Sequence, residues 1–203
     1  MKIELFIEIT GAVIGLTYLY LEYKASFWLW VAGIAMSLFY IYIYYNGKFY
    51  ADMGTYIYYL GANIYGLVLW SGYKKKTPSE HDTGIGIRHV KRNLIIPLIT
   101  ACLVIQALLY FILVTFTDSP VPLGDSFTTA LGIVAMWVMA KKYLEHWIFW
   151  IIVNGVSTAL YFWKGLYPTG VLFSIYTVVS VMGYFKWKRL MPDQSPEDKT
   201  EDR

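Results

Sequence analysis

The chain has 203 residues, of which 57% are hydrophobic and only 15% are charged. This apolar share lies well above the roughly 45–50% of an ordinary soluble domain, which argues against a water-soluble fold. The net charge of +3 is too small and scattered for a nucleic-acid footprint. The single cysteine, Cys102, can form neither an intrachain disulfide nor a cysteine-based metal cluster. What remains is a membrane-embedded helical bundle, with no room for a second folded domain.

Seven apolar runs, each bounded by charged residues, proline or glycine, predict an all-α polytopic membrane protein with seven transmembrane helices. The expected helices cover residues 3–22, 27–46, 51–71, 93–116, 124–140, 144–163 and 168–187. The first run carries Glu4 and Glu8 in its opening turns, unlike a cleavable signal peptide, so we expect it to be retained. Polar stretches follow the third and seventh runs and cannot bury a core.

Lysine and arginine fall unevenly on the two membrane faces that seven crossings define. The face that holds the N-terminus carries 3 of these residues, and the opposite face carries 14. Because basic residues are enriched in cytoplasmic loops, this bias predicts an external N-terminus and a cytoplasmic C-terminus.

An internal repeat emerges when the chain is shifted by 117 residues against itself. Among the residues that then coincide are six identical pairs and one pair of glutamate with aspartate: Gly15/Gly132, Lys24/Lys141, Trp30/Trp147, Tyr50/Tyr167, Gly66/Gly183, Trp70/Trp187 and Glu8/Asp125. We infer a parallel 3+1+3 repeat, because an odd number of crossings separates the two copies. Parallel repeats of this kind are typical of small-molecule transporters. The expected division is a first repeat 1–71, a cytoplasmic loop with linker helix 93–116 within 72–123, a second repeat 124–190 and a cytoplasmic polar tail 191–203.

Polar side chains near the middle of the expected spans are few, and they should face the bundle interior because hydrocarbon cannot satisfy them. Several share a helix face with aromatic rings, a layout in which rings stack a flat ligand and an amide bonds its edge. The candidate substrate-binding residues are Trp30, Ser37, Tyr56, Tyr59, Asn63, Gln106, Trp147, Trp150, Asn154, Ser157 and Tyr176.

Structural roles are open for several of these residues. The tryptophans at span ends, Trp30 and Trp147, are equally compatible with interfacial anchors, and Asn63 and Asn154 with interhelical hydrogen bonds. Glu8 and Asp125 occupy equivalent positions near the outer ends of the first and fifth spans. A carboxylate there can attract a cationic ligand or hold an outer gate, and it can equally be a solvated helix cap.

Other chemistry finds little support in the sequence. The chain has no phosphate-binding loop of the ATPase type, and His81, His89 and His146 lack the spacing of a metal site. The middle of the spans offers no nucleophile or base, so we expect neither an enzyme nor a cofactor. A buried acidic pair for proton or sodium coupling is also missing from the sequence pattern, which favours passive, substrate-driven movement.

Specific motifs resemble a known family. They are the segments 48–54, 117–120, 125–131 and 164–167 and the spacing Trp147-x-x-Trp150-x-x-x-Asn154. From Glu8 to Trp187 the chain resembles the Pnu family of bacterial vitamin transporters, the PnuC-like proteins that share a helix plan with SWEET sugar transporters. The resemblance implies uptake across the bacterial inner membrane by facilitated diffusion, trapping by a cytoplasmic kinase, and a homotrimer in which each protomer holds its own site.

The choice of vitamin depends on short stretches. Nicotinamide riboside members of the PnuC branch typically read Trp-Asn-Trp-Pro where this chain reads Trp28-Leu29-Trp30-Val31, and many carry an acid where Asn154 stands. The segment 21–30 resembles the thiamine-transporting PnuT branch more closely. Thiamine is therefore the expected substrate, with nicotinamide riboside as the alternative, because both are cationic rings that aromatic faces and amides can bind. A non-transporting receptor or subunit is the third possibility.

Overall fold

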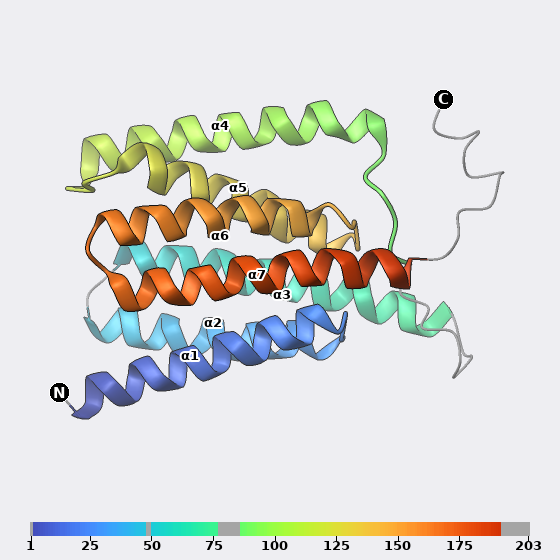
Figure 1. Cartoon of the computed structure of the whole chain (residues 1–203), viewed down its shortest axis with the longest axis horizontal. Coiled ribbons are helices and arrows are strands. Elements are labelled where there is room, and N and C mark those ends of the chain that lie inside the picture. The colour runs from blue at the N-terminus through green and yellow to red at the C-terminus, as the bar shows by residue number, and fades with distance from the viewer. Residues whose placement is uncertain (1, 48–49, 77–85, 192–203) are drawn as a thin grey trace. The chain divides into compact units, whose positions relative to one another are not determined.

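The computed structural model describes the backbone of residues 2–47, 50–76 and 86–191, and within these ranges it contains seven α-helices (Figure 1). The chain divides into two compact units, residues 1–85 and 86–203. The first unit holds α1 (Lys2–Tyr23), α2 (Trp28–Gly47) and α3 (Tyr50–Lys76). The second holds α4 (Arg92–Phe116), α5 (Pro122–Ala140), α6 (His146–Trp163) and α7 (Tyr167–Leu190). Each expected span coincides with one helix, and the largest difference is at α3, which continues past residue 71.

Four helical segments in the described part of the chain are long and apolar enough to cross a membrane by themselves. They are Trp28–Asn46, Arg92–Phe116, Pro122–Ala140 and Tyr167–Leu190. The strongest case is α4, which buries only Cys102 and exposes large apolar side chains such as Ile96 and Phe111. A helix that is apolar on its exposed faces needs hydrocarbon around it. The fold is that of an all-helical membrane protein.

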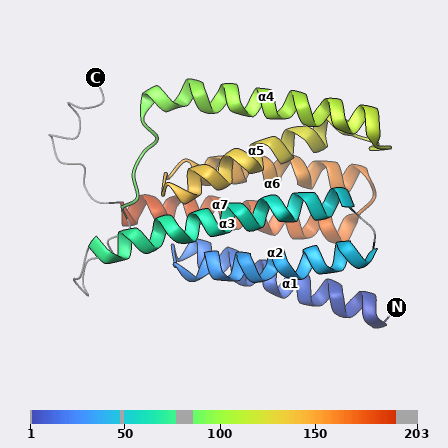
Figure 2. The ribbon, with the colours of Figure 1, turned by 180° about the vertical axis from the view of Figure 1, so that it is seen from behind.

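Within each unit, consecutive helices pack as antiparallel neighbours. In the first unit α2 contacts both α1 and α3, and in the second α4 lies beside α5, α5 beside α6, and α6 beside α7 (Figure 1, Figure 2). The helix expected to link the two repeats therefore packs with the helices that follow it. The expected polar tail 191–203 lies outside the described residues apart from Met191.

The turn between α1 and α2 has the same backbone geometry as the turn between α5 and α6. Ala25 and Lys142, which lie 117 residues apart, both have positive φ, of 51° and 59°. The next N–H bonds five residues back in each turn, from Ser26 to Leu21 O (2.9 Å) and from Tyr143 to Val138 O (3.1 Å). This is the Schellman arrangement, which satisfies carbonyls at a helix end. The offset seen in the sequence thus recurs in the local backbone structure.

Each unit also contains a buried tryptophan pair at the same offset. Trp30 meets Trp70 edge to face at 5.5 Å between ring centroids, and Trp147 meets Trp187 at 5.9 Å. Trp30, Trp147 and Trp187 are fully buried. Glycine makes this possible, because the Trp30 ring lies on Gly66 and the Trp147 ring on Gly183, where a Cβ would overlap the indole. These tryptophans are therefore packing residues within each unit, and interfacial anchoring does not describe them.

Candidate functional site

A buried amide–hydroxyl pair joins α6 to α7 in the second unit. The Asn154 Nδ2 group donates to Ser180 Oγ at 3.1 Å, and the Ser180 hydroxyl donates to the Tyr176 carbonyl at 2.8 Å. Asn154 and Ser180 are both buried. Because Ser180 accepts from one amide hydrogen, it sets the orientation of the Asn154 side chain. Ser180 is not among the expected substrate-binding residues, although its position 117 residues after Asn63 is a signal that the sequence offers.

The first unit has an amide in the repeat-related position. Asn63 on α3 donates from Nδ2 to the Tyr59 carbonyl at 2.7 Å, and it packs against Gly33 of α2, which has no Cβ to obstruct it. Its Oδ1 atom is buried and has no hydrogen-bond partner among the described residues. Ser37 donates to the Gly33 carbonyl at 2.8 Å. A buried amide oxygen without a donor is costly in hydrocarbon, so Asn63 has hydrogen-bonding capacity left for another group.

At equivalent positions, the two units carry the same kinds of polar side chain in the opposite order along the chain. Ser37 and Asn63 in the first unit correspond at the 117-residue offset to Asn154 and Ser180 in the second. Each helix pair thus carries one amide and one hydroxyl, but the amide moves from α3 in one unit to α6 in the other. The two units therefore offer different hydrogen-bond donors and acceptors at equivalent positions.

Aromatic residues lie four and seven positions before the buried polar residue of α3 and of α7. In the first unit Tyr56 stacks on Tyr40 at 4.7 Å between centroids and meets Tyr59 edge to face at 5.8 Å. In the second unit Phe173 lies 5.6 Å from Tyr176 and 4.9 Å from Tyr161. Both the α2–α3 pair and the α6–α7 pair thus carry several aromatic rings. Aromatic rings of this kind bind flat cationic ligands.

Trp150 and Asn154 share a face of α6 but have different neighbours. The Trp150 ring packs against Gly132 of α5, and its buried indole N–H has no acceptor in the described part of the chain. Asn154, by contrast, bonds to α7. Ser157, one turn further along α6, is also buried. In the second unit Trp150 therefore contacts α5, whereas Asn154 bonds to α7.

Three expected ligand residues lie elsewhere. Trp30 and Trp147 have no exposed surface, because each is enclosed by its partner tryptophan and a glycine. Gln106 lines a cavity of about 450 Å³ formed by α4, α5 and α6, together with Cys102, Leu131 and Phe149. The residues of the α6–α7 hydrogen bonds, Asn154, Tyr176 and Ser180, do not line that cavity. Among the described residues no cluster of three or more histidine, cysteine, aspartate or glutamate side chains could hold a metal ion.

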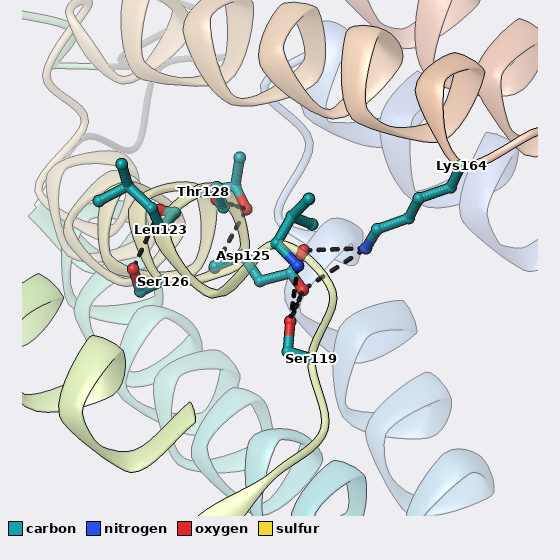
Figure 3. Close-up of polar contacts among 8 residues, drawn as sticks. Ser119, Leu123, Asp125, Ser126, Thr128 and Lys164 are labelled. Carbon is teal, nitrogen blue, oxygen red and sulfur yellow. Dashed lines mark hydrogen bonds and ion pairs between the residues drawn. The ribbon is translucent and has the colours of Figure 1, made fainter. Parts of the chain in front are cut away.

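Asp125 is held by neighbours at the start of α5 (Figure 3). Its carboxylate accepts from the Ser119 hydroxyl at 2.7 Å and from Lys164 Nζ at 3.2 and 3.4 Å. Lys164 is the residue that directly follows α6, so the contact ties the α6–α7 turn to α5 and to the segment that follows α4. The Asp125 carboxylate therefore already has a cationic partner and a hydroxyl donor within the protein, which favours a structural role over the attraction of a cationic ligand. The side chain of its counterpart, Glu8, lies outside the described residues.

Replacing Asp125 by asparagine is expected to lower the thermal midpoint of the detergent-purified protein by about 2–4 °C. The reason is that a partly exposed ion pair contributes at most about 1 kcal/mol, and this is the corresponding shift for a chain of this size. Asp118→Asn, a nearby exposed aspartate, is the matched control and should leave the midpoint unchanged. An unchanged midpoint in Asp125→Asn combined with a large loss of substrate affinity would instead mark Asp125 as a cation-attracting group.

Comparisons with known proteins agree with this architecture. The family model described as nicotinamide mononucleotide transporter matches residues 5–189. The nicotinamide riboside transporter PnuC of Escherichia coli is 27% identical over 160 residues, covering 69% of this chain and 67% of that protein. The riboflavin/roseoflavin transporter RibM of Streptomyces davaonensis is 24% identical over 187 residues, covering 89% of this chain and 83% of that protein.

A solved structure shares the fold. The crystal structure of the vitamin B3 transporter PnuC aligns with a TM-score of 0.70 and 22% sequence identity, covering 91% of this chain and 81% of that chain. At this identity the likeness establishes the helical fold and leaves the ligand contacts to be argued from the residues of this chain.

Proposed function

Because this chain belongs to the nicotinamide mononucleotide transporter family, we propose that it is a vitamin uptake transporter whose substrate is nicotinamide riboside. Relatives named for nicotinamide riboside and riboflavin match 69% and 89% of the chain. The sequence-based preference for thiamine depended on the short segment 21–30. The longer matches favour the alternative, so nicotinamide riboside now leads and thiamine becomes the competitor to be tested.

The observation that carries this proposal is the buried Asn154–Ser180 pair beside aromatic rings. Nicotinamide riboside combines a cationic pyridinium ring, a carboxamide and ribose hydroxyls. An amide side chain held by a hydroxyl can bond the carboxamide edge, while aromatic faces bind the cationic ring. The proposed contacts in the second unit are Trp150, Asn154, Ser157 and Tyr176, and those in the first unit are Ser37, Tyr56, Tyr59 and Asn63.

The proposed mechanism is facilitated diffusion, with the product of a cytoplasmic kinase trapped inside the cell. It is supported by the sequence pattern, in which the spans carry no buried acidic pair suited to ion coupling. We propose the external N-terminus and cytoplasmic C-terminus on the basis of the basic-residue bias. The inner-membrane location and the homotrimer follow from the family resemblance.

The parallel 3+1+3 plan and its relation to SWEET transporters are also proposed. The recurrence of the Ala25 turn at Lys142 supports the plan, and so does the recurrence of the Trp30–Trp70 contact at Trp147–Trp187. The corresponding division places repeats at 1–71 and 124–190, a loop and linker helix in 72–123, and a tail at 191–203.

The test is flux into liposomes that contain only the purified protein. Labelled nicotinamide riboside is expected to equilibrate across the membrane at a rate unaffected by protonophores, and to accumulate beyond equilibrium when a nicotinamide riboside kinase and ATP are enclosed. Unlabelled nicotinamide riboside should compete better than thiamine or riboflavin. Protein-free liposomes provide the background rate. Thiamine flux without nicotinamide riboside flux would reverse the substrate assignment, and binding without flux of any vitamin would favour a receptor or subunit.

A further inference from the structure

None of the proposed substrate contacts lines the cavity of about 450 Å³ in the second unit. It is lined mainly by apolar side chains of three helices, among them Leu98, Cys102, Leu103, Leu131, Ile148 and Phe149. Its polar lining residues are Gln106 and Glu145. The volume falls in the range of about 300–1,000 Å³ typical of ligand sites. Its wall on α4 is open to the surroundings, because Ile99 and Leu103 are 55% and 60% exposed.

The length of the cavity matches one leaflet of a bilayer. On α4 it extends from Ile95 to Gln106, eleven residues along the helix. At 1.5 Å per residue this span is about 16 Å, close to half of the roughly 30 Å hydrocarbon thickness. An acyl chain that enters at the end near Ile95 would reach the membrane centre at Gln106.

A short segment of chain closes one end of the cavity and is fixed to the α5–α6 turn. Arg88 N–H donates to the Lys142 carbonyl at 3.2 Å, and Leu144 N–H donates to the Arg88 carbonyl at 3.0 Å. The two carboxylate oxygens of Glu145 contact His89 Nδ1 at 2.7 Å and accept from Val90 N–H at 2.9 Å. The only carboxylate in this segment and turn is therefore already engaged by the protein.

The charges at this end are mostly positive. Residues 86–92 and 141–145 together contain five lysines and arginines against the one carboxylate: Arg88, Lys91, Arg92, Lys141 and Lys142. Arg88 and Lys141 lie over the rings of Tyr143 and Trp137, at 5.1 and 5.7 Å. Burial lowers the pKa of Lys142 to about 8, which still leaves its amine mainly protonated at pH 7. Lys91 and Arg92 are exposed at the start of α4 and have no carboxylate partner within the described residues.

We propose that this cavity binds one acyl chain of an anionic phospholipid from the surrounding bilayer, with the headgroup phosphate against Lys91 and Arg92. Basic residues beside a gap between membrane helices are a recognised feature of anionic lipid sites. The cationic end disfavours a cationic vitamin, and an apolar helix of a second copy would fill the cavity but leave Lys91 and Arg92 without an anion. The proposal is independent of the transported substrate.

Cys102 provides a site-specific probe, because it is the only cysteine in the chain and it lines the cavity. The full chain is stripped of lipid in detergent, and the alkylation of Cys102 by N-ethylmaleimide is followed by intact mass. Phosphatidylglycerol is expected to slow alkylation at least fivefold at a concentration where phosphatidylcholine slows it less than twofold. Native mass spectra should show one retained phosphatidylglycerol per protomer.

Two double variants then test the headgroup contact. Lys91→Gln/Arg92→Gln should remove the difference between the two lipids, whereas Lys188→Gln/Arg189→Gln, which neutralises two exposed basic residues in the last turn of α7, should keep it. Both pairs are on the surface, and an unchanged thermal midpoint without lipid verifies the fold. Equal protection by both lipids, or full selectivity in Lys91→Gln/Arg92→Gln, would overturn the proposal. The proposal would also be overturned if the protection of Cys102 from alkylation rose with protein concentration and did not depend on lipid. That result would assign the cavity to a second copy of the chain.

Discussion

Asn154→Ala is expected to weaken binding of nicotinamide riboside about 30-fold in calorimetric titration of the purified protein. The variant removes a buried hydrogen-bonding group and leaves the ligand amide without a partner, which costs about 2 kcal/mol, equivalent to that factor in affinity. The side chain is buried and bonds to Ser180 of α7. This expected loss of affinity rests on the proposed function, in which the Asn154 amide contacts the substrate.

Substitutions of Ser180 test whether this hydroxyl positions the Asn154 amide or only packs α7 against α6. Ser180→Ala leaves the Asn154 side chain in place but frees its orientation, so we expect a smaller loss of affinity, about fivefold, from one neutral hydrogen bond of roughly 1 kcal/mol. Ser180→Thr keeps the hydroxyl and should restore most of the binding. Ser174→Ala is the matched control, because Ser174 makes the same contact to the carbonyl four residues back and none to Asn154. Equal affinities in Asn154→Ala and Ser174→Ala would remove this face from the substrate site, even if the liposome assay shows transport.

The helices of this fold could be predicted from sequence because apolar runs of membrane length are bounded by charge. The limits of α2, α4 and α6 agree with the expected spans within two residues. Even the paired turns had a signal, since Lys24 and Lys141 lie at the 117-residue offset and both precede a residue with positive φ. What the sequence could not show was how each helix is rotated.

Rotation explains the differences at the candidate site. Gln106 shares its expected depth with Asn63 and Asn154, but α4 is apolar on every side, so its sequence pattern does not show which face Gln106 joins. Trp30 and Trp147 were expected to be ligand contacts or interfacial anchors. Instead they fill the space above Gly66 and Gly183. Asp125 has a partner 39 residues away, Lys164, which spacing along one helix cannot reveal.

The second prediction with a large expected effect concerns Gly183, the glycine against which the Trp147 ring packs. Gly183→Ala would place a Cβ 2.5 Å from Cη2 of Trp147, inside van der Waals contact. The ring has little room to move, because the Trp187 ring lies edge to face at 5.9 Å and the His146 ring lies at 4.7 Å, measured between centroids. Overpacking of this kind typically costs 1–3 kcal/mol. We therefore expect a fall of about 2–12 °C in the thermal midpoint of a protein of this size.

Gly155→Ala is the matched control for this result. A Cβ at Gly155 meets nothing within 4 Å, so the same exchange should leave the midpoint unchanged or raise it, because alanine favours helix over glycine by up to about 1 kcal/mol. Because both substitutions exchange glycine for alanine in a helix, changes of opposite sign in the thermal midpoint would separate the effect of the packing contact from that of helix propensity. Trp147→Phe should relieve the clash, so the cost of Gly183→Ala is expected to shrink in that background, a non-additivity typical of residues in contact. Equal midpoints for Gly183→Ala and Gly155→Ala would mean that the Trp147 ring shifts freely, and the close approach of Trp147 to Gly183 would then not be what limits the packing of α6 against α7.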